Sequence, residues 1–539
     1  MTEKVQLKNL TRQAYFIGLV LTAVGLTLSP FLMGMSQFWL AAVWIADGIV
    51  NKDFSAKWHA FSRNKTAVLL VSLYLLHVVG LVYTSDFSYA FKDLRVKLPL
   101  LVLPFVMSSM PALNRKQGDG LIKLYVLSVF VATWFSFAAY LKHDYEDVRE
   151  ISRFISHIRF CLQIVFCVFI LGYYLYTERQ KSKWMLVVYV MLMLWFCYQV
   201  YIFETLSGYV VLAAALMVSI VYAFLRWKNG AGWRIGIVVL ALTALVLGSM
   251  AVYRMAKPMM TIETVDFDKL EKKTALGNDY WHDTIYNHVE DGRYVGLYYC
   301  RKELQETWPK RSGLAWSDKT ANGEDLESTL ARYLTSKGLR KDAEGVMALT
   351  DEDVRNIEQG VANYNNWLQP GLRARLSSTI FEYNVYRRFN NPNGGSLSQR
   401  IEYTRASLYL IRKHWLFGVG TGDVPNAFRQ AYEELRSPLK EEFRHKAHNQ
   451  YLSITVGFGV VGLALFLVVL FYPYLSAKRN RHYLYTIFLC ILVLSMFPED
   501  TIETQAGAMF YAFFSALFLL GLKREDSSSF EKDPQKIKI

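Results

Sequence analysis

The chain has 539 residues, of which 53% are hydrophobic and 20% are charged, and its formal net charge is +14. Soluble domains usually hold about 45–50% apolar and about 25% charged residues, and here the apolar residues gather in runs such as 14–32 and 121–139, long enough to cross a bilayer. The basic residues fall mostly in short loops between these runs, which excludes a concentrated basic surface and predicts no nucleic-acid partner.

The apolar runs predict about twelve membrane-spanning helices. The first run follows a polar start without a cleavage pattern, so we expect it to remain as an anchor. The predicted spans cover residues 13–30, 36–50, 66–83, 97–110, 121–141, 158–177, 185–203, 208–225, 233–253, 449–472, 483–497 and 506–522.

The loops between these spans predict the orientation of the chain. If the spans alternate, the loops rich in Lys and Arg share one side, which is then the cytoplasm. These loops lie at 52–65, 115–123, 179–183, 226–234 and 478–481. We therefore expect a multi-pass protein of a bacterial inner (cytoplasmic) membrane, surrounded by membrane lipids, with its large insertion on the periplasmic side.

The predicted fold class is all-α, and the chain is expected to divide into four parts. These are an N-terminal membrane domain of about nine spans (1–253), a periplasmic domain (254–448), three C-terminal spans (449–522) and a disordered cytoplasmic tail (523–539). The periplasmic domain is expected to be mostly helical. It has polar helical patterns at 325–339 and 351–363, a turn at 391–395, and an amphipathic segment at 400–415 that would lie along the membrane.

A glycine cluster, Gly418–Gly422, precedes the first of the last three spans. No strand precedes it and it lacks the lysine of a phosphate-binding loop. Two interpretations stay open. The cluster is either a tight turn that lets the backbone pack at the membrane surface, or a substrate contact through Gly420.

His448 and its neighbour Asn449 stand where the next span begins, on the periplasmic side. An imidazole titrates near neutral pH and can take a proton from a hydroxyl group. The alternative is an interfacial histidine that bonds a backbone carbonyl. His445 lies three residues earlier, but no carboxylate in this stretch completes a ligand set, so we expect no metal site.

More ionisable residues fall at the same face of the membrane. Single charges at span ends often only reach toward the lipid headgroups. Together, guanidinium groups can bind a diphosphate in bidentate fashion, and a nearby histidine can act as a base. The candidate substrate-binding residues are Arg95, His157, Arg159, Arg405, Asn449, Gly420, Glu499 and Asp500, with Arg400 and His448 as candidate catalytic residues.

The segments 416–422, 448–452 and 459–462 resemble the O-antigen ligase family, which includes O-antigen polymerases and protein O-oligosaccharyltransferases. The stretches 155–160 and 499–505 are similar to a Bacteroidetes-type branch, as is residue range 329–339.

The resemblance implies a GT-C-like, inverting, metal-independent glycosyltransferase of lipopolysaccharide biosynthesis that uses no cofactor. It implies a glycan on undecaprenyl diphosphate as donor, with lipid A–core or another hydroxyl compound as acceptor. His448 matches the essential histidine of the family, and Arg400 matches an arginine that binds diphosphate. Many members carry Ser-Arg where this chain has Ser207-Gly208, so Arg159 or Arg95 is expected to supply the missing charge.

Three alternatives to a ligase remain from the sequence. An O-antigen polymerase or a protein O-oligosaccharyltransferase would share the donor and differ in the acceptor. A polysaccharide transporter or flippase would place charges within its spans and often shows repeated halves, whereas here the charges cluster at one face. An anchored structural or sensor protein would tolerate changes at Arg400 and His448.

Overall fold

The computed structural model describes residues 2–142, 148–180, 182–226, 231–285, 288–369, 371–476 and 482–523, and it is predominantly α-helical. The N-terminal helices are α1 (Thr2–Leu28), α2 (Pro30–Asn51), α3 (Phe54–Ser62), α4 (Lys65–Val79), α5 (Phe87–Lys97), α6 (Pro99–Ser109), α7 (Arg115–Lys142), α8 (His157–Thr177), α9 (Lys183–Ile202), α10 (Leu206–Arg226) and α11 (Ala231–Met260). The last helices are α20 (Gln450–Ser476), α21 (Tyr483–Ser495) and α22 (Gln505–Ala516), the last continued by η8 (Leu517–Gly521).

Eight of the described helices are long and apolar enough to cross a membrane. They lie at Val5–Leu28, Pro30–Asn51, Lys65–Tyr83, Arg115–Lys142, His157–Thr177, Lys183–Ile202, Leu206–Phe224 and Gln450–Ser476. Tyr483–Ser495 and Gln505–Gly521 are shorter apolar segments. Each of the twelve predicted spans overlaps a helix, which confirms a polytopic all-α membrane protein. The number twelve stays a prediction, because helices such as α6, with 11 residues, are too short to cross alone.

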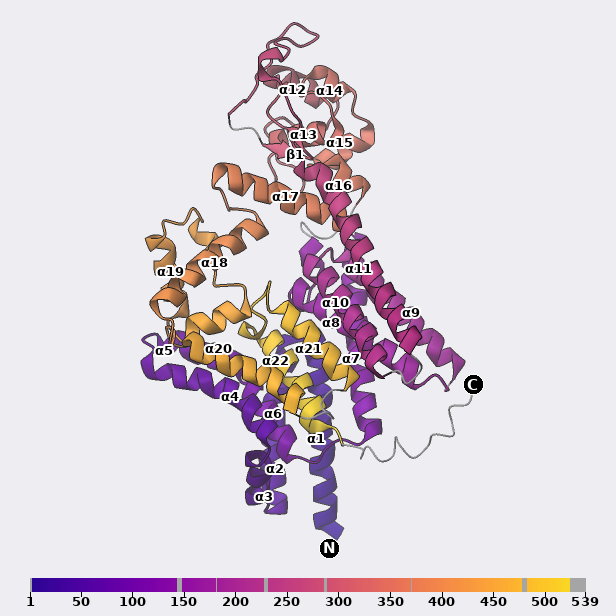
Figure 1. Ribbon diagram of the computed structural model, residues 1–539, viewed down its shortest axis with the longest axis vertical. Helices are drawn as coiled ribbons and strands as arrows, with labels where there is room; N and C mark the ends of the chain where they lie inside the picture. Colours follow the sequence, from indigo (N-terminus) through magenta and orange to yellow (C-terminus); the bar gives the residue numbers. More distant parts are fainter. Residues whose placement is uncertain are drawn as a thin grey trace.

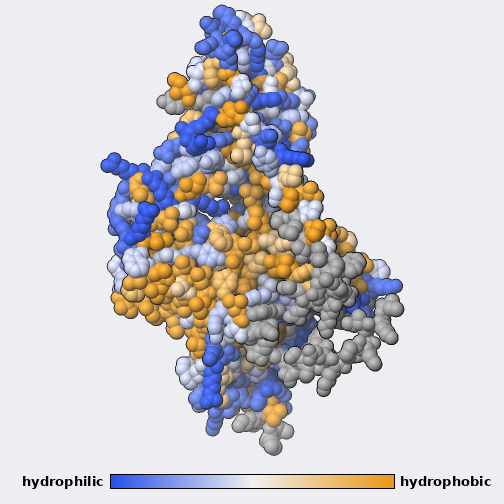
Figure 2. All heavy atoms as spheres, viewed as in Figure 1, coloured by the Kyte–Doolittle hydropathy of each residue, from blue (hydrophilic) through white to orange (hydrophobic). Residues whose placement is uncertain are grey.

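The membrane helices enclose one apolar core to which both ends of the chain contribute. Helix α22 packs against α6, and α21 packs against α8 and α10, so the C-terminal helices complete a bundle begun by the N-terminal ones (Figure 1). Hydrophobic residues gather over the middle of the molecule, and hydrophilic residues cover the insertion above it (Figure 2). This banding is typical of a protein that sits across a lipid bilayer.

Helices are the main regular elements of the insertion between α11 and α20. It contains α12 (Arg301–Thr307), α13 (Leu326–Lys337), α14 (Ala343–Met347), α15 (Asp351–Glu358), α16 (Tyr364–Leu368), α17 (Leu372–Phe389), α18 (Ser396–Lys413) and α19 (Val424–Glu434). Strands β1 (Val289–Glu290) and β2 (Arg293–Tyr294) form a small antiparallel hairpin. The helical patterns predicted at 325–339 and 351–363 are confirmed as α13 and α15.

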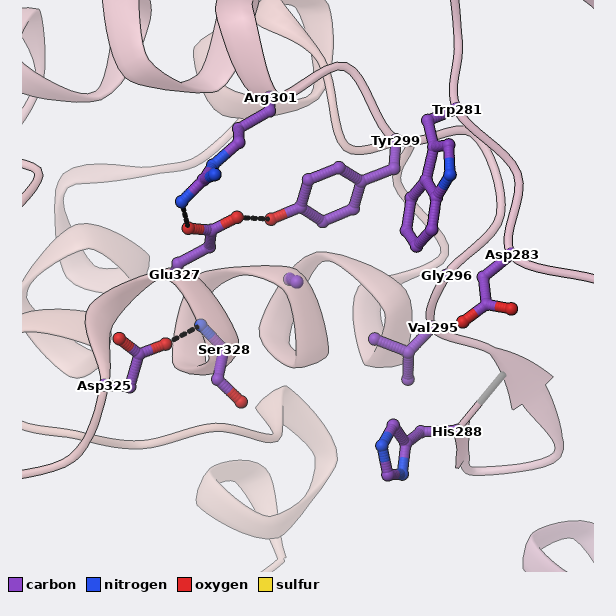
Figure 3. A pocket seen from close by; sticks show the side chains of 11 residues that line it. Trp281, Asp283, His288, Val295, Gly296, Tyr299, Arg301, Asp325, Glu327 and Ser328 are labelled. Atoms are coloured by element: carbon purple, nitrogen blue, oxygen red, sulfur yellow. Dashed lines mark hydrogen bonds and ion pairs between the residues drawn. The ribbon is translucent and has the colours of Figure 1, made fainter. Parts of the chain in front are cut away.

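Local sequence explains why α13 and α15 form where they do. The side chain of Asp325 caps the start of α13, and Gly338 ends it in the left-handed conformation. Thr350 and Asp353 form a capping box at α15. The two helices close over a core that includes Trp308. Beside α13 lies a cavity (Figure 3).

Helix α18 corresponds to the amphipathic segment predicted to lie along the membrane. Its apolar side chains Tyr403, Ala406 and Leu410 are buried, with α19 and the start of α20, in one small core. Protein therefore covers these three side chains, while Leu397, Ile401 and Leu408 on the same helix are exposed. That the segment lies along the membrane stays a prediction. The predicted tail after Lys523 lies outside the described residues.

Candidate functional site

The glycine cluster packs backbone against backbone at a break in α20. Gly459 has φ 64° within that helix, and the N–H groups of Val419 and Gly420 donate to the carbonyls of Val456 and Gly457, both at 2.9 Å. A Cβ at Gly459 would lie 2.1 Å from the carbonyl oxygen of Leu416. The geometry supports the packing interpretation of this turn. A substrate contact through Gly420 stays a prediction.

This turn fixes the start of α20, where His448 lies. Asn449 accepts a hydrogen bond from the N–H of Leu452 at 3.0 Å and donates to the carbonyl of Phe497 at 2.8 Å. Asn449 therefore caps α20 and ties it to the chain segment that follows α21. These two bonds give Asn449 a structural role beside the predicted base.

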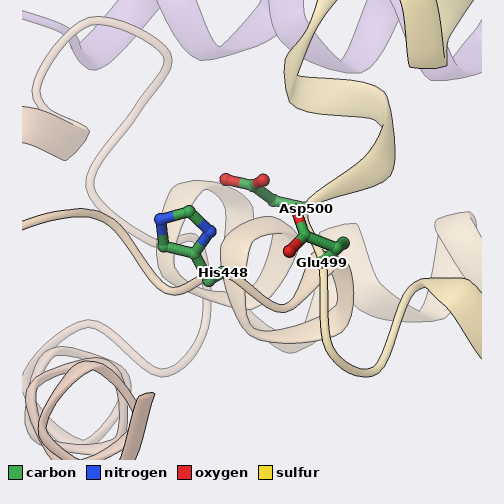
Figure 4. A group of neighbouring side chains, drawn as sticks. All are labelled: His448, Glu499 and Asp500. Carbon is green, nitrogen blue, oxygen red and sulfur yellow. The ribbon is translucent and has the colours of Figure 1, made fainter. Parts of the chain in front are cut away.

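The site group consists of His448, Glu499, Asp500, Arg159 and Arg400. The imidazole of His448 and the carboxylates of Glu499 and Asp500 face one another across the gap between α20 and the loop after α21 (Figure 4). One side-chain ligand atom from each of the three lies within 4.8 Å of the others. Residues some fifty positions apart thus form one cluster.

Two arginines converge on the acidic residues of this group. Nη2 of Arg400, from α18, donates to Oε1 of Glu499 at 2.8 Å. Nη2 of Arg159, near the start of α8, lies 3.7 Å from Oε2 of Glu499 and 3.5 Å from Oδ1 of Asp500. Among the described residues, the buried Nε of Arg159 has no hydrogen-bond partner. The guanidinium of Arg159 is therefore less fully paired than that of Arg400.

Gln450 holds the acidic loop beside His448. Its side-chain oxygen accepts from the N–H of Ile502 at 2.6 Å, and its backbone N–H is shared between the carbonyls of Met496 and Glu499. The side chain is fully buried. Sequence analysis did not single out Gln450, although its position directly after the His-Asn pair was a usable signal.

Burial dominates the electrostatics of the group. It lowers the pKa of His448 below its usual value, while the charge of Asp500 raises that pKa and Arg400 lowers it. Burial likewise raises the pKa of Glu499, against the opposing effect of Arg400 and Arg159. A depressed histidine pKa keeps the imidazole neutral at physiological pH, which is the form that accepts a proton.

Tyr403 also belongs to the surroundings of His448. Its ring stacks on the imidazole with centroids 5.3 Å apart and an interplanar angle of 27°. Tyr403 lies one helical turn after Arg400 on α18, so both reach the same region. That spacing was visible in the sequence, and sequence analysis did not use it.

A second charged cluster lies next to the first and was not predicted. Glu503 binds Lys97, whose Nζ lies 2.9 Å from Oε2, and Lys446 lies 3.7 Å from the same carboxylate. Lys97 also pairs with Asp93, and Lys446 donates to the hydroxyl of Tyr89 at 3.0 Å. The two lysines lower the pKa of Glu503. This cluster fastens the start of α22 to α5 and to the segment before His448.

The structure does not bring every predicted residue into the site group. Arg95 is exposed on α5 and forms no ion pair among the interactions described, whereas Arg159 lies beside Glu499 and Asp500. Arg405 lies 3.7 Å from Glu402 on the same helix. His157 begins α8, two residues before Arg159.

Two carboxylates lie near the histidines after all. No carboxylate close in sequence completes a ligand set, but the fold brings Glu499 and Asp500 beside His448. Both carboxylates are also close to guanidinium groups. The two guanidinium groups balance the charge of the carboxylates, which weakens the attraction of this group for a divalent cation.

The comparisons with known proteins bear on the same part of the chain. No curated protein matches the chain. One family model, described as O-Antigen ligase, matches residues 371–467. This range holds Arg400, the glycine turn and His448. The resemblance seen in the sequence is thus confirmed: in the segment 371–467, which holds Arg400 and His448, the chain is O-antigen ligase-like.

Proposed function

We propose that the protein is an inner-membrane O-antigen ligase that transfers a glycan from undecaprenyl diphosphate to lipid A–core at the periplasmic face. One observation carries the proposal. Arg159 and Arg400 converge on Glu499 beside a half-buried His448, and the Nε of Arg159 has no partner among the described residues. A lipid-linked diphosphate carries the charge that such donors recognise.

The arginines would stabilise the leaving diphosphate. Its negative charge grows as the bond between the anomeric carbon and the phosphate oxygen breaks. Fixed donors in a site partly shielded from water stabilise that charge better than bulk water does, because they need no reorganisation. Nη2 of Arg159 lies 3.7 Å from Glu499, beyond hydrogen-bond distance, so a phosphate oxygen would compete with a looser ion pair there than at Arg400.

His448 would act as the base. It takes the proton of the acceptor hydroxyl while the hydroxyl oxygen forms its bond to the anomeric carbon, on the face opposite the leaving diphosphate. This inverts the configuration at that carbon. The nearby Asp500 carboxylate stabilises the imidazolium that forms, and the stacked ring of Tyr403 orients the imidazole.

Transfer by the purified full-length protein in lipid nanodiscs tests the chemistry. We expect His448→Ala to lower kcat by roughly 10²–10⁴-fold, the usual contribution of general-base catalysis. Arg400→Gln should also lower the rate strongly. The matched control is Arg412→Gln, an exposed arginine on the same helix, which should leave the rate unchanged. Normal turnover by His448→Ala would refute the assigned role.

Deletion of the gene in its host tests the acceptor. Gel analysis of lipopolysaccharide should show loss of long chains together with accumulation of lipid-linked glycan. Retention of single-repeat lipopolysaccharide would instead identify a polymerase, and an unchanged profile with altered glycoproteins would identify a transferase to protein. Complementation with the wild-type gene, but not with the His448→Ala gene, should restore the profile.

A further inference from the structure

A cavity of about 480 Å³ lies inside the insertion, away from the His448 group along the long axis of the molecule (Figures 1 and 3). Ligand pockets in proteins commonly measure about 300–1,000 Å³, so this one can hold a small organic group. It opens between α13 and the segment that contains Trp281 and Tyr299. Neither its location nor its lining is used by the transfer chemistry proposed above.

Two aromatic rings form one wall of the cavity. Trp281 and Tyr299 are joined by reciprocal backbone hydrogen bonds of 2.8 and 3.1 Å, and their ring centroids lie 6.1 Å apart at an interplanar angle of 88°. The Trp281 side chain is 60% exposed at the rim. An exposed indole held on fixed backbone offers a flat apolar surface to a ligand with an apolar face, at little entropic cost.

Hydrogen-bond acceptors form the opposite wall. Glu327 accepts from Nη2 of Arg301 at 2.7 Å and from the hydroxyl of Tyr299 at 2.8 Å. Asp325 accepts from the N–H of Ser328 at 2.8 Å, and Asp283 lies on the far side beside His288 (Figure 3). These bonds fix the carboxylates and leave further lone pairs for donors from a ligand.

The charge of the lining selects against anions. Three carboxylates face one guanidinium, and Glu327 already binds that guanidinium. His288 supplies no compensating charge, because burial lowers its pKa. An anionic ligand would meet net repulsion, whereas hydroxyl groups would find acceptors.

We propose that this cavity binds a neutral, hydroxyl-rich sugar, with the apolar face of the ring on Trp281 and its hydroxyls donating to Glu327 and Asp325. A pyranose combines these two surfaces in one small molecule. That this sugar belongs to the transferred glycan rests on the proposed function. That the cavity binds a sugar at all does not depend on the proposed function. The cavity would hold the glycan at a point remote from the reacting end.

Saturation-transfer NMR on the full-length protein in lipid nanodiscs tests the proposal, since nanodiscs avoid detergents with sugar headgroups. The probes are N-acetylglucosamine, mannose and glucuronate. We expect transfer to the ring protons of at least one neutral sugar and none to glucuronate. Trp281→Ala should weaken binding at least tenfold. Trp367→Ala, a partly exposed tryptophan outside the cavity, is the matched control and should bind normally.

A second variant keeps the test decisive if Trp281→Ala fails to fold. Glu327→Gln preserves the shape of the side chain, removes one negative charge from the lining and frees the charge of Arg301, so it should bind glucuronate more tightly than the wild type does. Binding of no neutral sugar by the wild type, or equal binding by Trp281→Ala, would overturn the proposal. His448→Ala should bind sugar like the wild type. Its normal turnover would overturn the proposed function while leaving the sugar site standing.

Discussion

His448 adopts a backbone conformation that non-glycine residues seldom use. Its φ is 46°, in the left-handed region, which costs such a residue roughly 1–2 kcal/mol. Strain of this kind tends to persist where the surrounding structure fixes a functional side chain. Here the cap formed by Asn449 and the tether formed by Gln450 follow directly, so the imidazole is held between Tyr403 and the acidic loop.

The pKa of His448 predicts how activity depends on pH. The base must be neutral, so the rate falls as pH drops through its pKa, and burial places that fall below pH 6.5. Asp500→Asn removes a charge that raises the pKa of His448, so the fall in rate on the acid side should move to lower pH. Arg400→Gln removes a charge that lowers the pKa of His448, so the fall in rate on the acid side should move to higher pH.

Initial rates measured across pH 4.5–8.5 check these opposite shifts, with Arg412→Gln again as the control. If the fall in rate on the acid side moved in the same direction for both variants, His448 would not be the base. The maximal rates of both variants are expected to fall. The pH at which the rate reaches half of its maximum still gives the pKa of the titrating group, whatever the size of that loss.

At this scale the sequence identified most of the site group. His448, Arg400, Arg159, Glu499 and Asp500 were recognisable because ionisable residues at a membrane boundary are costly unless they have a use. Which arginine would reach His448 was not recognisable. That depends on how α5, α8 and α18 pack, and the packing leaves Arg95 exposed while it buries Arg159.

Helix α20 depends on a break in its own hydrogen bonding. The kink at Gly459 exposes backbone groups that pair with the segment after α18, and the N–H of Val460 donates to the carbonyl of Trp415 at 2.8 Å. Glycine is needed there for two reasons, since φ is positive and the facing backbone leaves no space for a Cβ.

Two glycines in this helix should therefore respond differently to alanine. Gly459→Ala is expected to destabilise the protein by roughly 2–4 kcal/mol, because it adds strain and a backbone clash. Gly457→Ala is the control, since a Cβ there would meet only Val424 at an ordinary 3.8 Å. Thermal unfolding in nanodiscs measures both, and equal melting temperatures would contradict the packing described.

The sequence predicted the helices well but not their finer form. Long apolar runs and capping residues locate helices directly, as for α8 and α13. The break within α20 was hidden, because an apolar run with three glycines reads as one span. The packing of α18 against α19 and the start of α20 was also hidden, since periodicity indicates that a face is buried but not whether lipid or protein covers it.

The whole molecule has a polar insertion at one end and the N-terminus at the other (Figure 1). In the proposed orientation Ser317 lies in the periplasm. A maleimide that crosses the outer membrane but not the inner membrane should therefore label Ser317→Cys in intact cells. It should label Ser55→Cys only after the inner membrane is opened. Both positions are exposed, and labelling of the wild type sets the baseline from the native cysteines. The reverse pattern would place the His448 group in the cytoplasm.

The two sides of the insertion are joined by more than the polypeptide itself. The N–H of Gly371 donates to Glu204 at 2.6 Å, Asp423 accepts hydrogen bonds from Ser85 and Asp86, and α22 is packed against α6 within the bundle. A single nick in the exposed stretch near Ser317 should therefore leave both fragments associated. The gene could be divided at that point, and the two polypeptides, made separately in one cell, should reassemble by complementation.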